Sequence, residues 1–274
     1  MSIIERFISF FEAKGTVPQI FGLYHFLCVL ATLLLCVFLV WKFKDASIRT
    51  IRLLVLGFWV TLVLLEIIKQ LEGAYDMTGA EPTWEYFWHI FPFQFCSTPL
   101  YVMPFVIFLP DGWWRRSIMA FFACFSLFAG LVVMIYPGDV YCANIFVNIQ
   151  TMIHHGSMVA LGVLLVARNR NHMNKQFFGG SMMIFYSFVS IAMLLNELVY
   201  AFHLQDLPQH TFNMFFISRH YDCTLPLLSI IYKAVPYGWF LVIYIVGFTF
   251  ASALIYTVEK SILTLIHKIK EKHA

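Results

Sequence analysis

Charged residues are scarce in this sequence. Only 12% of its 274 residues are Asp, Glu, Lys or Arg, and 61% are hydrophobic, whereas an ordinary soluble domain carries about 25% charged residues. Apolar runs recur along the whole chain, and no polar block is long enough to form a separate soluble domain. The composition therefore excludes an ordinary soluble protein and predicts an integral, multi-pass membrane protein in contact with membrane lipids.

Several common signals are also missing. The first residues lack the cleavage site of a signal peptide, so we interpret residues 1–15 as an interfacial amphipathic helix. The net charge is only +3, and the basic residues form no stripe with interleaved aromatics, which argues against a nucleic-acid partner. The six cysteines include no CxxC pair. No HExxH, GxSxG, P-loop or dinucleotide motif is present, and we expect neither a metal nor a cofactor.

Seven stretches approach the roughly 20 apolar residues that a helix needs to cross a bilayer core of about 30 Å. We therefore predict an all-α polytopic membrane protein, with residues 1–274 forming one domain of seven transmembrane helices. Residues 211–235 contain an eighth apolar piece that could be re-entrant. The seven predicted spans are residues 20–41, 53–71, 88–109, 117–136, 145–167, 177–202 and 237–258.

The basic residues predict the orientation, because Lys and Arg are retained in cytoplasmic connections. They gather after the first, third, fifth and seventh spans. Only an odd number of spans, with the N-terminus outside and the C-terminus in the cytoplasm, places these connections together. Residues 259–274 are then a basic cytoplasmic tail. The residues concerned are Lys42, Lys44, Arg49, Arg52, Arg115, Arg116, Arg168, Arg170, Lys175, Lys260, Lys268, Lys270 and Lys272.

A polar set stands inside the third predicted span, where it is costly unless it faces protein or water. At about 1.5 Å per residue, Cys96 lies roughly 12 Å below the outer surface and His154 and His155 lie about 15 Å below it. The three residues are thus expected at one level. Other polar residues near the outer ends of the spans join this layer, and the inner half is almost wholly apolar. They are His25, Glu66, Gln94, Ser97, Asn148, Gln150, Asn196 and Glu197.

This pattern predicts a polar bowl open to the outside, with Cys96 at its centre. A thiol in apolar surroundings needs a base beside it to become a nucleophile, and histidine is the usual partner. Gln94 and Ser97 are candidate donors to an oxyanion. Plainer roles remain open for the other residues. His25 and Gln150 can form hydrogen bonds between helices, Glu66 can pair with Lys69, and Glu197 can orient a histidine.

The sequence resembles the YwaF-like integral membrane proteins, a bacterial group related to the eukaryotic transmembrane protein 164. The resemblance implies a location in a bacterial cell membrane. Phe93 and Phe95 depart from the smaller aliphatic residues expected beside Gln94. The resemblance is carried by Arg52 before a span with Glu66, FPFQFCS around Cys96, YPGD at 136–139, IQTMIHHGS with both histidines, LLNEL with Asn196, and NMFFISRHYDCTLP from Asn213.

The resemblance implies a lipid acyltransferase with Cys96 as nucleophile and His155 or His154 as base. We prefer His155, because Thr151 and Asn148 lie one and two helical turns before it and could orient its ring. Phospholipids or lysophospholipids would be the acyl donor and acceptor. A distant similarity to androgen-induced membrane hydrolases, which cleave fatty-acid esters, makes ester hydrolysis a related possibility. The rival hypothesis is a non-catalytic binding or transport protein that uses the polar bowl as a pocket.

Overall fold

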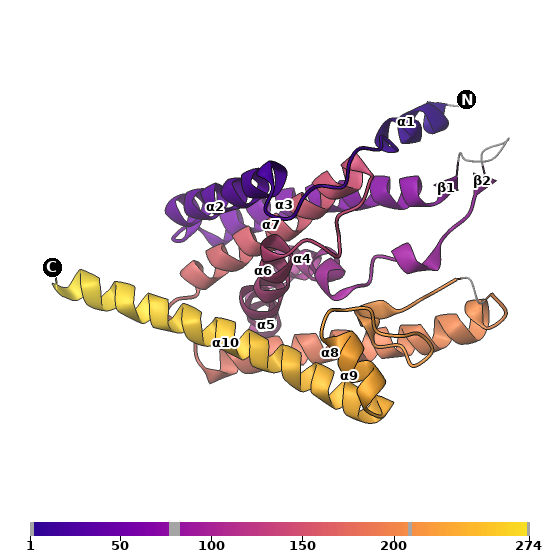
Figure 1. Cartoon of the computed structure of the whole chain (residues 1–274). Coiled ribbons are helices and arrows are strands. Elements are labelled where there is room, and N and C mark those ends of the chain that lie inside the picture. The colour runs from indigo at the N-terminus through magenta and orange to yellow at the C-terminus, as the bar shows by residue number, and fades with distance from the viewer. Residues whose placement is uncertain (1–2, 77–82, 208–209, 273–274) are drawn as a thin grey trace.

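A computed structural model describes residues 3–76, 83–207 and 210–272 of the chain (Figure 1). Nearly all of its regular structure is helical, which confirms the all-α prediction. The strands that it describes form one short antiparallel pair, β1 (Tyr75–Asp76) and β2 (Thr83–Trp84), with Tyr75 opposite Trp84. The first helix, α1 (Ile3–Phe11), falls within the predicted interfacial segment.

Six helical segments in the described part of the chain are long and apolar enough to cross a membrane, as a polytopic membrane protein requires. Two of these segments include a stretch of π-helix. The segments are α2 (Leu23–Phe43), α3 (Ile48–Gly73), α5 (Trp113–Phe121) continued by η3 (Phe122–Ser126) and α6 (Leu127–Ile135), α7 (Ile145–Arg168), α8 (Lys175–Val199) continued by η4 (Tyr200–Leu204), and α10 (Tyr237–Lys272).

The predicted third span, residues 88–109, differs from this pattern. Two 3₁₀ turns, η1 (Trp88–Ile90) and η2 (Phe95–Ser97), precede a helix, α4 (Thr98–Phe108), that is too short to cross a bilayer. Two prolines account for the interruption of the helix, because proline restricts its own backbone and that of the residue before it. Phe91 precedes Pro92 and has an extended ψ of 128°, as expected before proline, and Pro99 lies in the first turn of α4. Cys96 therefore lies in a turn before α4, not eight residues inside a helix.

The predicted re-entrant piece, residues 211–235, is mostly irregular. It contains the 3₁₀ turn η5 (Met214–Phe216) and the short helix α9 (Leu228–Ala234). Its first part is nevertheless deeply buried, with Phe212, Met214 and Phe215 all fully covered. Residues 211–218, which we name the inner loop, therefore pack inside the bundle without crossing it.

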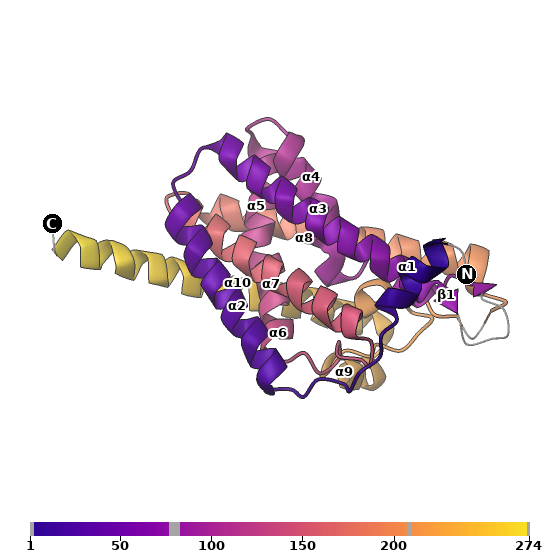
Figure 2. The ribbon, with the colours of Figure 1, turned by 90° about the horizontal axis from the view of Figure 1, so that it is seen from above.

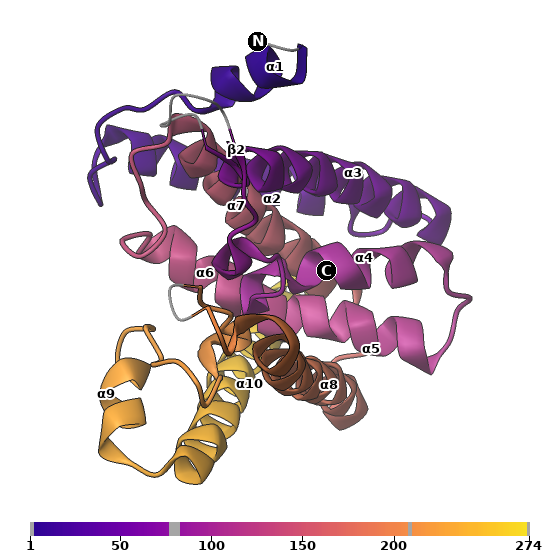
Figure 3. The same ribbon diagram turned by 90° about the vertical axis from the view of Figure 1, so that its right-hand side faces the viewer.

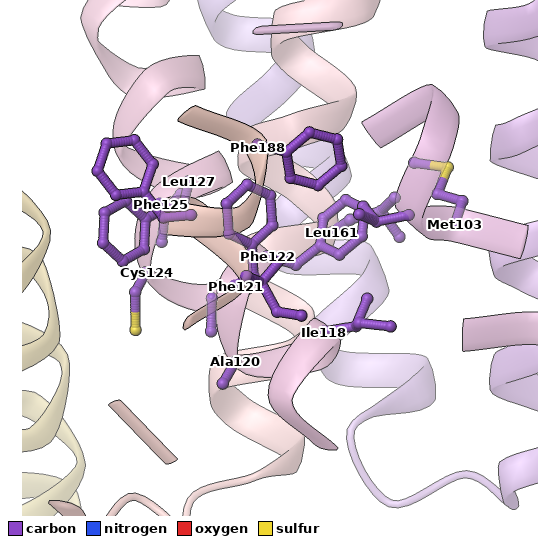
Figure 4. Packing of buried hydrophobic residues seen from close by; sticks show 14 of the residues in the cluster. Met103, Ile118, Ala120, Phe121, Phe122, Cys124, Phe125, Leu127, Leu161 and Phe188 are labelled. Atoms are coloured by element: carbon purple, nitrogen blue, oxygen red, sulfur yellow. The ribbon is translucent and has the colours of Figure 1, made fainter. Parts of the chain in front are cut away.

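The helix α7 is the most buried of the six long segments and packs against α2, α3, α6 and η3. Its contacts with α6 and η3 are close, because a Cβ on Gly162 would come within 2.7 Å of Leu127 Cβ in α6 and 3.1 Å of Phe122 O in η3. Phenylalanine rings from α5, η3 and α8 fill the neighbouring core, including Phe121, Phe125 and Phe188 (Figure 4). The apolar side chains of α2, α3 and α10 are largely exposed, as lipid-facing surfaces require.

The two described ends of the chain lie at opposite ends of the bundle (Figures 1 and 2), while α8 and α10 lie on the side away from α2 and α3 (Figure 3). Three of the basic connections meet at the end towards which α10 runs. Arg168 donates to Ala46 O and Arg52 donates to Leu109 O, each at 2.5 Å. These contacts place the predicted cytoplasmic connections together, and their side of the membrane stays a prediction. The predicted tail, from residue 259, continues α10 as helix through Lys272.

Candidate active site

His154 and Cys96 meet in the structure although 58 positions separate them in the sequence. The imidazole Nε2 of His154, which is buried in α7, lies 2.8 Å from the main-chain carbonyl oxygen of Cys96 in η2. Cys96 itself is half-buried. The hydrogen bond involves the main chain rather than the thiol, so it fixes the position of the residue, while the thiol itself interacts with the Ser97 side chain.

The two histidines each keep one nitrogen available. A carbonyl oxygen only accepts hydrogen bonds, so the nitrogen that contacts one must carry the proton. His154 donates from Nε2 to Cys96, and His155 donates from Nδ1 to Thr151 O at 2.8 Å. Within the described chain, His154 Nδ1 and His155 Nε2 are buried and have no hydrogen-bond partner. Each neutral ring therefore has an unoccupied basic nitrogen, and the ring centres are 5.5 Å apart.

Tyr244 on α10 is a further candidate that the sequence analysis missed. Its side chain is only 1% exposed, and its hydroxyl has no hydrogen-bond partner among the described residues. Its phenol group lies within electrostatic range of the Cys96 thiol. The Tyr244 ring stacks on Phe248 with centroids 4.5 Å apart, and Phe248 contacts Phe95 at 5.2 Å. This aromatic chain links α10 to the turn that carries Cys96.

Glu66 lies at the centre of a polar network beside these residues. Its carboxylate accepts from Gln70 at 2.7 Å and from Gln150 of α7 at 3.2 Å, and it pairs with Lys69 at 3.4 Å. Gln70 also donates to Ile90 O at 2.6 Å. The charges of Glu66 and Lys69 act on both Cys96 and His154. The network thus joins α3, α7 and the turn before Cys96. Its charges contribute to the electrostatic field at Cys96 and His154.

The network reaches outside the spans at Tyr86. The hydroxyl of Tyr86 donates to the side-chain oxygen of Gln70 at 2.9 Å. Burial, with a smaller effect of the Glu66 carboxylate, raises the pKa of Tyr86 above its usual value of 10.0. The hydroxyl therefore keeps its proton at neutral pH and remains a donor to Gln70.

Gln94 and Asn196 attach the inner loop to the bundle. Gln94 donates to Asn213 O at 2.9 Å and accepts from Phe215 N at 2.8 Å. Asn196 donates to Met214 O at 3.0 Å and accepts from Met214 N at 2.7 Å. Both side chains are therefore occupied with main-chain groups, and one N–H of the Gln94 amide remains for the oxyanion role that the sequence suggested.

These bonds hold a strained backbone. Phe215 and Phe216 both have a φ of 58°, a conformation that costs an aromatic residue about 1–3 kcal/mol. Gln94 accepts a hydrogen bond from Phe215 N, and Asn196 accepts one from the adjacent Met214 N. The strained turn places the ring of Phe215 against Phe93 and Phe95, with centroids 6.0 and 5.8 Å apart. The two phenylalanines that flank Gln94 thus pack between the inner loop and the turn that carries Cys96.

Four other predicted residues have contacts of their own. Asn148 binds both N and O of Cys142, at 3.0 and 2.7 Å, and does not orient His155. His25 Nε2 lies 2.8 Å from Met134 O. Glu197 pairs with Arg219 at 2.9 Å and with His220 at 3.1 Å. The main-chain N–H of Ser97 donates to Gln94 O, and the Ser97 hydroxyl interacts with the Cys96 thiol.

In the part of the chain that the structure describes, no group of three or more His, Cys, Asp or Glu side chains is placed to hold a metal ion. All six cysteines are free, including Cys142 and Cys223 near the predicted outer face. The polar groups that do converge are a thiol, two imidazoles and a phenol. Such a set is suited to nucleophilic and acid–base chemistry.

An apolar groove of about 260 Å³ runs between α2 and α7. Ile153 and Gly156, the neighbours of the histidine pair, line it together with Cys28 and Thr32 from α2. The groove is open to the surroundings of the bundle where α2 exposes its apolar side chains. It has the character expected of a surface that receives a lipid chain.

The fold and this buried polar site define the chain as a helical, multi-pass integral membrane protein. A family model, described as the TMEM164 family, matches residues 20–257. Because the match covers most of the chain, the protein belongs to the TMEM164 family, in agreement with the resemblance found in its sequence. Neither the curated proteins nor the solved structures gave a match.

Gln94→Ala is predicted to loosen the inner loop. The change leaves Asn213 O and Phe215 N without their partners, and each such loss costs about 1–3 kcal/mol when the group is buried. Hydrogen exchange followed by mass spectrometry should show faster exchange in the peptide that contains Phe215. Gln205→Ala removes an exposed side chain of the same type and should leave this peptide unchanged. Equal protection in Gln94→Ala and the wild type would contradict this role for Gln94.

Proposed function

We propose that this protein is a lipid acyltransferase that forms an acyl-thioester on Cys96. The observation that carries the proposal is the hydrogen bond between His154 and the Cys96 carbonyl, which brings a histidine pair with two unoccupied nitrogens to the turn that carries the thiol. Family membership supports it, and so does the apolar groove between α2 and α7. The acyl donor and acceptor would be a phospholipid and a lysophospholipid.

In the proposed first half-reaction, His155 Nε2 takes the proton of the Cys96 thiol. The thiolate attacks the ester carbonyl carbon, an S–C bond forms and the carbonyl oxygen becomes an oxyanion. The ester C–O bond then breaks, and the departing lysolipid oxygen receives the proton from His155. We assign the positioning role to His154, because its Nε2–H donates to the carbonyl of Cys96 itself, and the base role to its neighbour His155. His154 is then a positioning residue for the turn that carries the nucleophile.

In the second half-reaction, the hydroxyl of the acceptor gives its proton to His155 and attacks the thioester. The C–S bond breaks, the new ester forms, and the proton returns to Cys96. Tyr244 is the proposed donor to both oxyanions, because its buried hydroxyl has no partner among the described residues. The α2–α7 groove would receive the acyl chain next to the histidine pair. If the predicted orientation is correct, the lipids enter from the outer leaflet.

Cys96→Ala is predicted to abolish acyl transfer and the covalent intermediate. Intact-protein mass spectrometry of the wild type after incubation with phospholipid should detect a long-chain acyl adduct, and peptide mapping should locate it on Cys96. Cys142→Ala removes another half-buried thiol, one outside the α2–α7 groove, and should keep both the adduct and the activity. Acyl transfer that persists in Cys96→Ala would refute the thioester mechanism. A Cys96→Ser protein that binds lipid normally and functions in cells would instead favour the binding or transport alternative.

The two histidine variants are predicted to differ. His155→Gln removes the proposed base and should slow acyl transfer by about 10²–10⁴-fold. His154→Gln keeps a side-chain N–H that can donate to the Cys96 carbonyl, so a loss below about tenfold is expected for a positioning role. Single-turnover rates of adduct formation measure the effect directly. The reverse ranking would make His154 the base, and two variants as fast as the wild type would rule out either as the base.

Tyr244→Phe is predicted to separate activity from stability. Loss of an oxyanion donor should lower the rate about 10²–10³-fold, while removal of a buried hydroxyl without a partner should leave the melting temperature unchanged or higher. Tyr256→Phe, a matched change twelve positions later on α10, should affect neither. Unchanged adduct formation and turnover in Tyr244→Phe would exclude Tyr244 from the reaction.

A further inference from the structure

A second polar site lies at the opposite ends of the helices that carry the candidate active site. The connections 44–47, 109–112 and 169–174 meet there, and the side chains around them enclose a pocket of about 380 Å³. Arg168 ends α7, fourteen positions after His154, which corresponds to about 21 Å along a helix. The pocket is therefore distinct from the site around Cys96.

The pocket has an excess of positive charge. Two carboxylates are present, and each already has a cationic partner. Asp111 pairs with Arg115 at 2.8 Å, and Asp45 pairs with Arg170 at 2.8 Å. Two carboxylates do not balance five cations, so the pocket presents a field that attracts anions. The cationic side chains that line it are Lys44, Arg115, Arg116, Arg168 and Arg170.

Arg115 provides independent evidence for a missing ligand. Its side chain is only 5% exposed, and its Nε has no hydrogen-bond partner in the described residues. A buried guanidinium with an unused N–H is costly, and an anion with several oxygens would satisfy it, since guanidinium geometry suits phosphate. Arg115 also lies in the first turn of α5, which lacks a side-chain cap, and such a helix end favours a negative group.

Membrane orientation alone does not explain these features. Retention of positive charge in cytoplasmic connections requires only that Lys and Arg be present. It requires no cavity, and it does not require an arginine to be buried. Trp113 and Trp114, both exposed at the start of α5 beside Arg115, are typical of residues at the level of lipid headgroups. The pocket is thus suited to a group that reaches it from the membrane surface.

We propose that this pocket binds a phosphate group, with Arg115, Arg116 and Arg170 as its principal ligands. Two sources share this chemistry, the headgroup of an anionic phospholipid and a soluble phosphate compound. The indole pair favours the lipid. Arg115 would use its free Nε, while the exposed Arg116 would close over the ligand.

The test uses the full-length protein in detergent and two double variants. Short-chain phosphatidylglycerol, short-chain phosphatidylcholine and inorganic phosphate are titrated separately, and binding is measured by native mass spectrometry and by thermal shift. Arg116→Gln/Arg170→Gln changes two exposed or half-exposed lining residues and leaves the buried Arg115 intact. Lys260→Gln/Lys268→Gln removes the same charge from exposed positions of α10 outside the pocket.

We expect phosphatidylglycerol to bind the wild type more tightly than phosphatidylcholine does, and the Arg116→Gln/Arg170→Gln protein to bind it at least tenfold more weakly. The α10 control should bind as the wild type does. Competition by inorganic phosphate would assign the site to soluble phosphates, and its absence would assign it to the lipid headgroup. Equal binding of both lipids, or equal weakening in both double variants, would overturn the proposal.

Discussion

The main-chain groups of irregular segments need hydrogen-bond partners when they lie inside a membrane protein, because no lipid or bulk water can supply them. This constraint governs the two segments that surround Cys96. His154 and Gln70 satisfy carbonyls in the turns before α4, and Gln94 and Asn196 satisfy the inner loop. Many polar side chains of the spans therefore form hydrogen bonds with main-chain groups of irregular segments. These bonds maintain the shape of the interior of the bundle.

The hydrogen-bond partners of the polar side chains distinguish structural groups from reactive ones. Gln94, Asn148 and Asn196 use both ends of their amides on main-chain groups, so little of their hydrogen-bonding capacity remains for a substrate. The imidazoles retain one nitrogen each, and Tyr244 retains its hydroxyl. A polar residue in a span is thus informative only after its local partners are known. The proposed chemistry is assigned to the groups that remain.

Much of the helical layout could be predicted from the sequence, since length and apolar character alone define a long membrane helix. The interruption at residues 88–97 was missed because a hydropathy window counts Phe91 and Phe93 as span and ignores what Pro92 does to the backbone. The depth below the outer surface, estimated from the number of residues along each predicted helix, placed Cys96 and His154 at a similar depth. It could not identify the partners of Gln94 and Asn196, because the inner loop has no periodic pattern. Tyr244 was missed because one tyrosine in an aromatic-rich helix gives no signal.

The length of α10 has a mechanical consequence. Its 36 residues extend about 54 Å at 1.5 Å per residue, well beyond the thickness of a hydrocarbon core of about 30 Å. The helix passes beyond the rest of the bundle (Figure 1). Its last described turns, with Lys268, Glu271 and Lys272 exposed, form a stiff stalk in water. A fluorophore attached there would report the tilt of this rod, including any tilt transmitted from the Cys96 turn through the contact between Phe95 and Phe248.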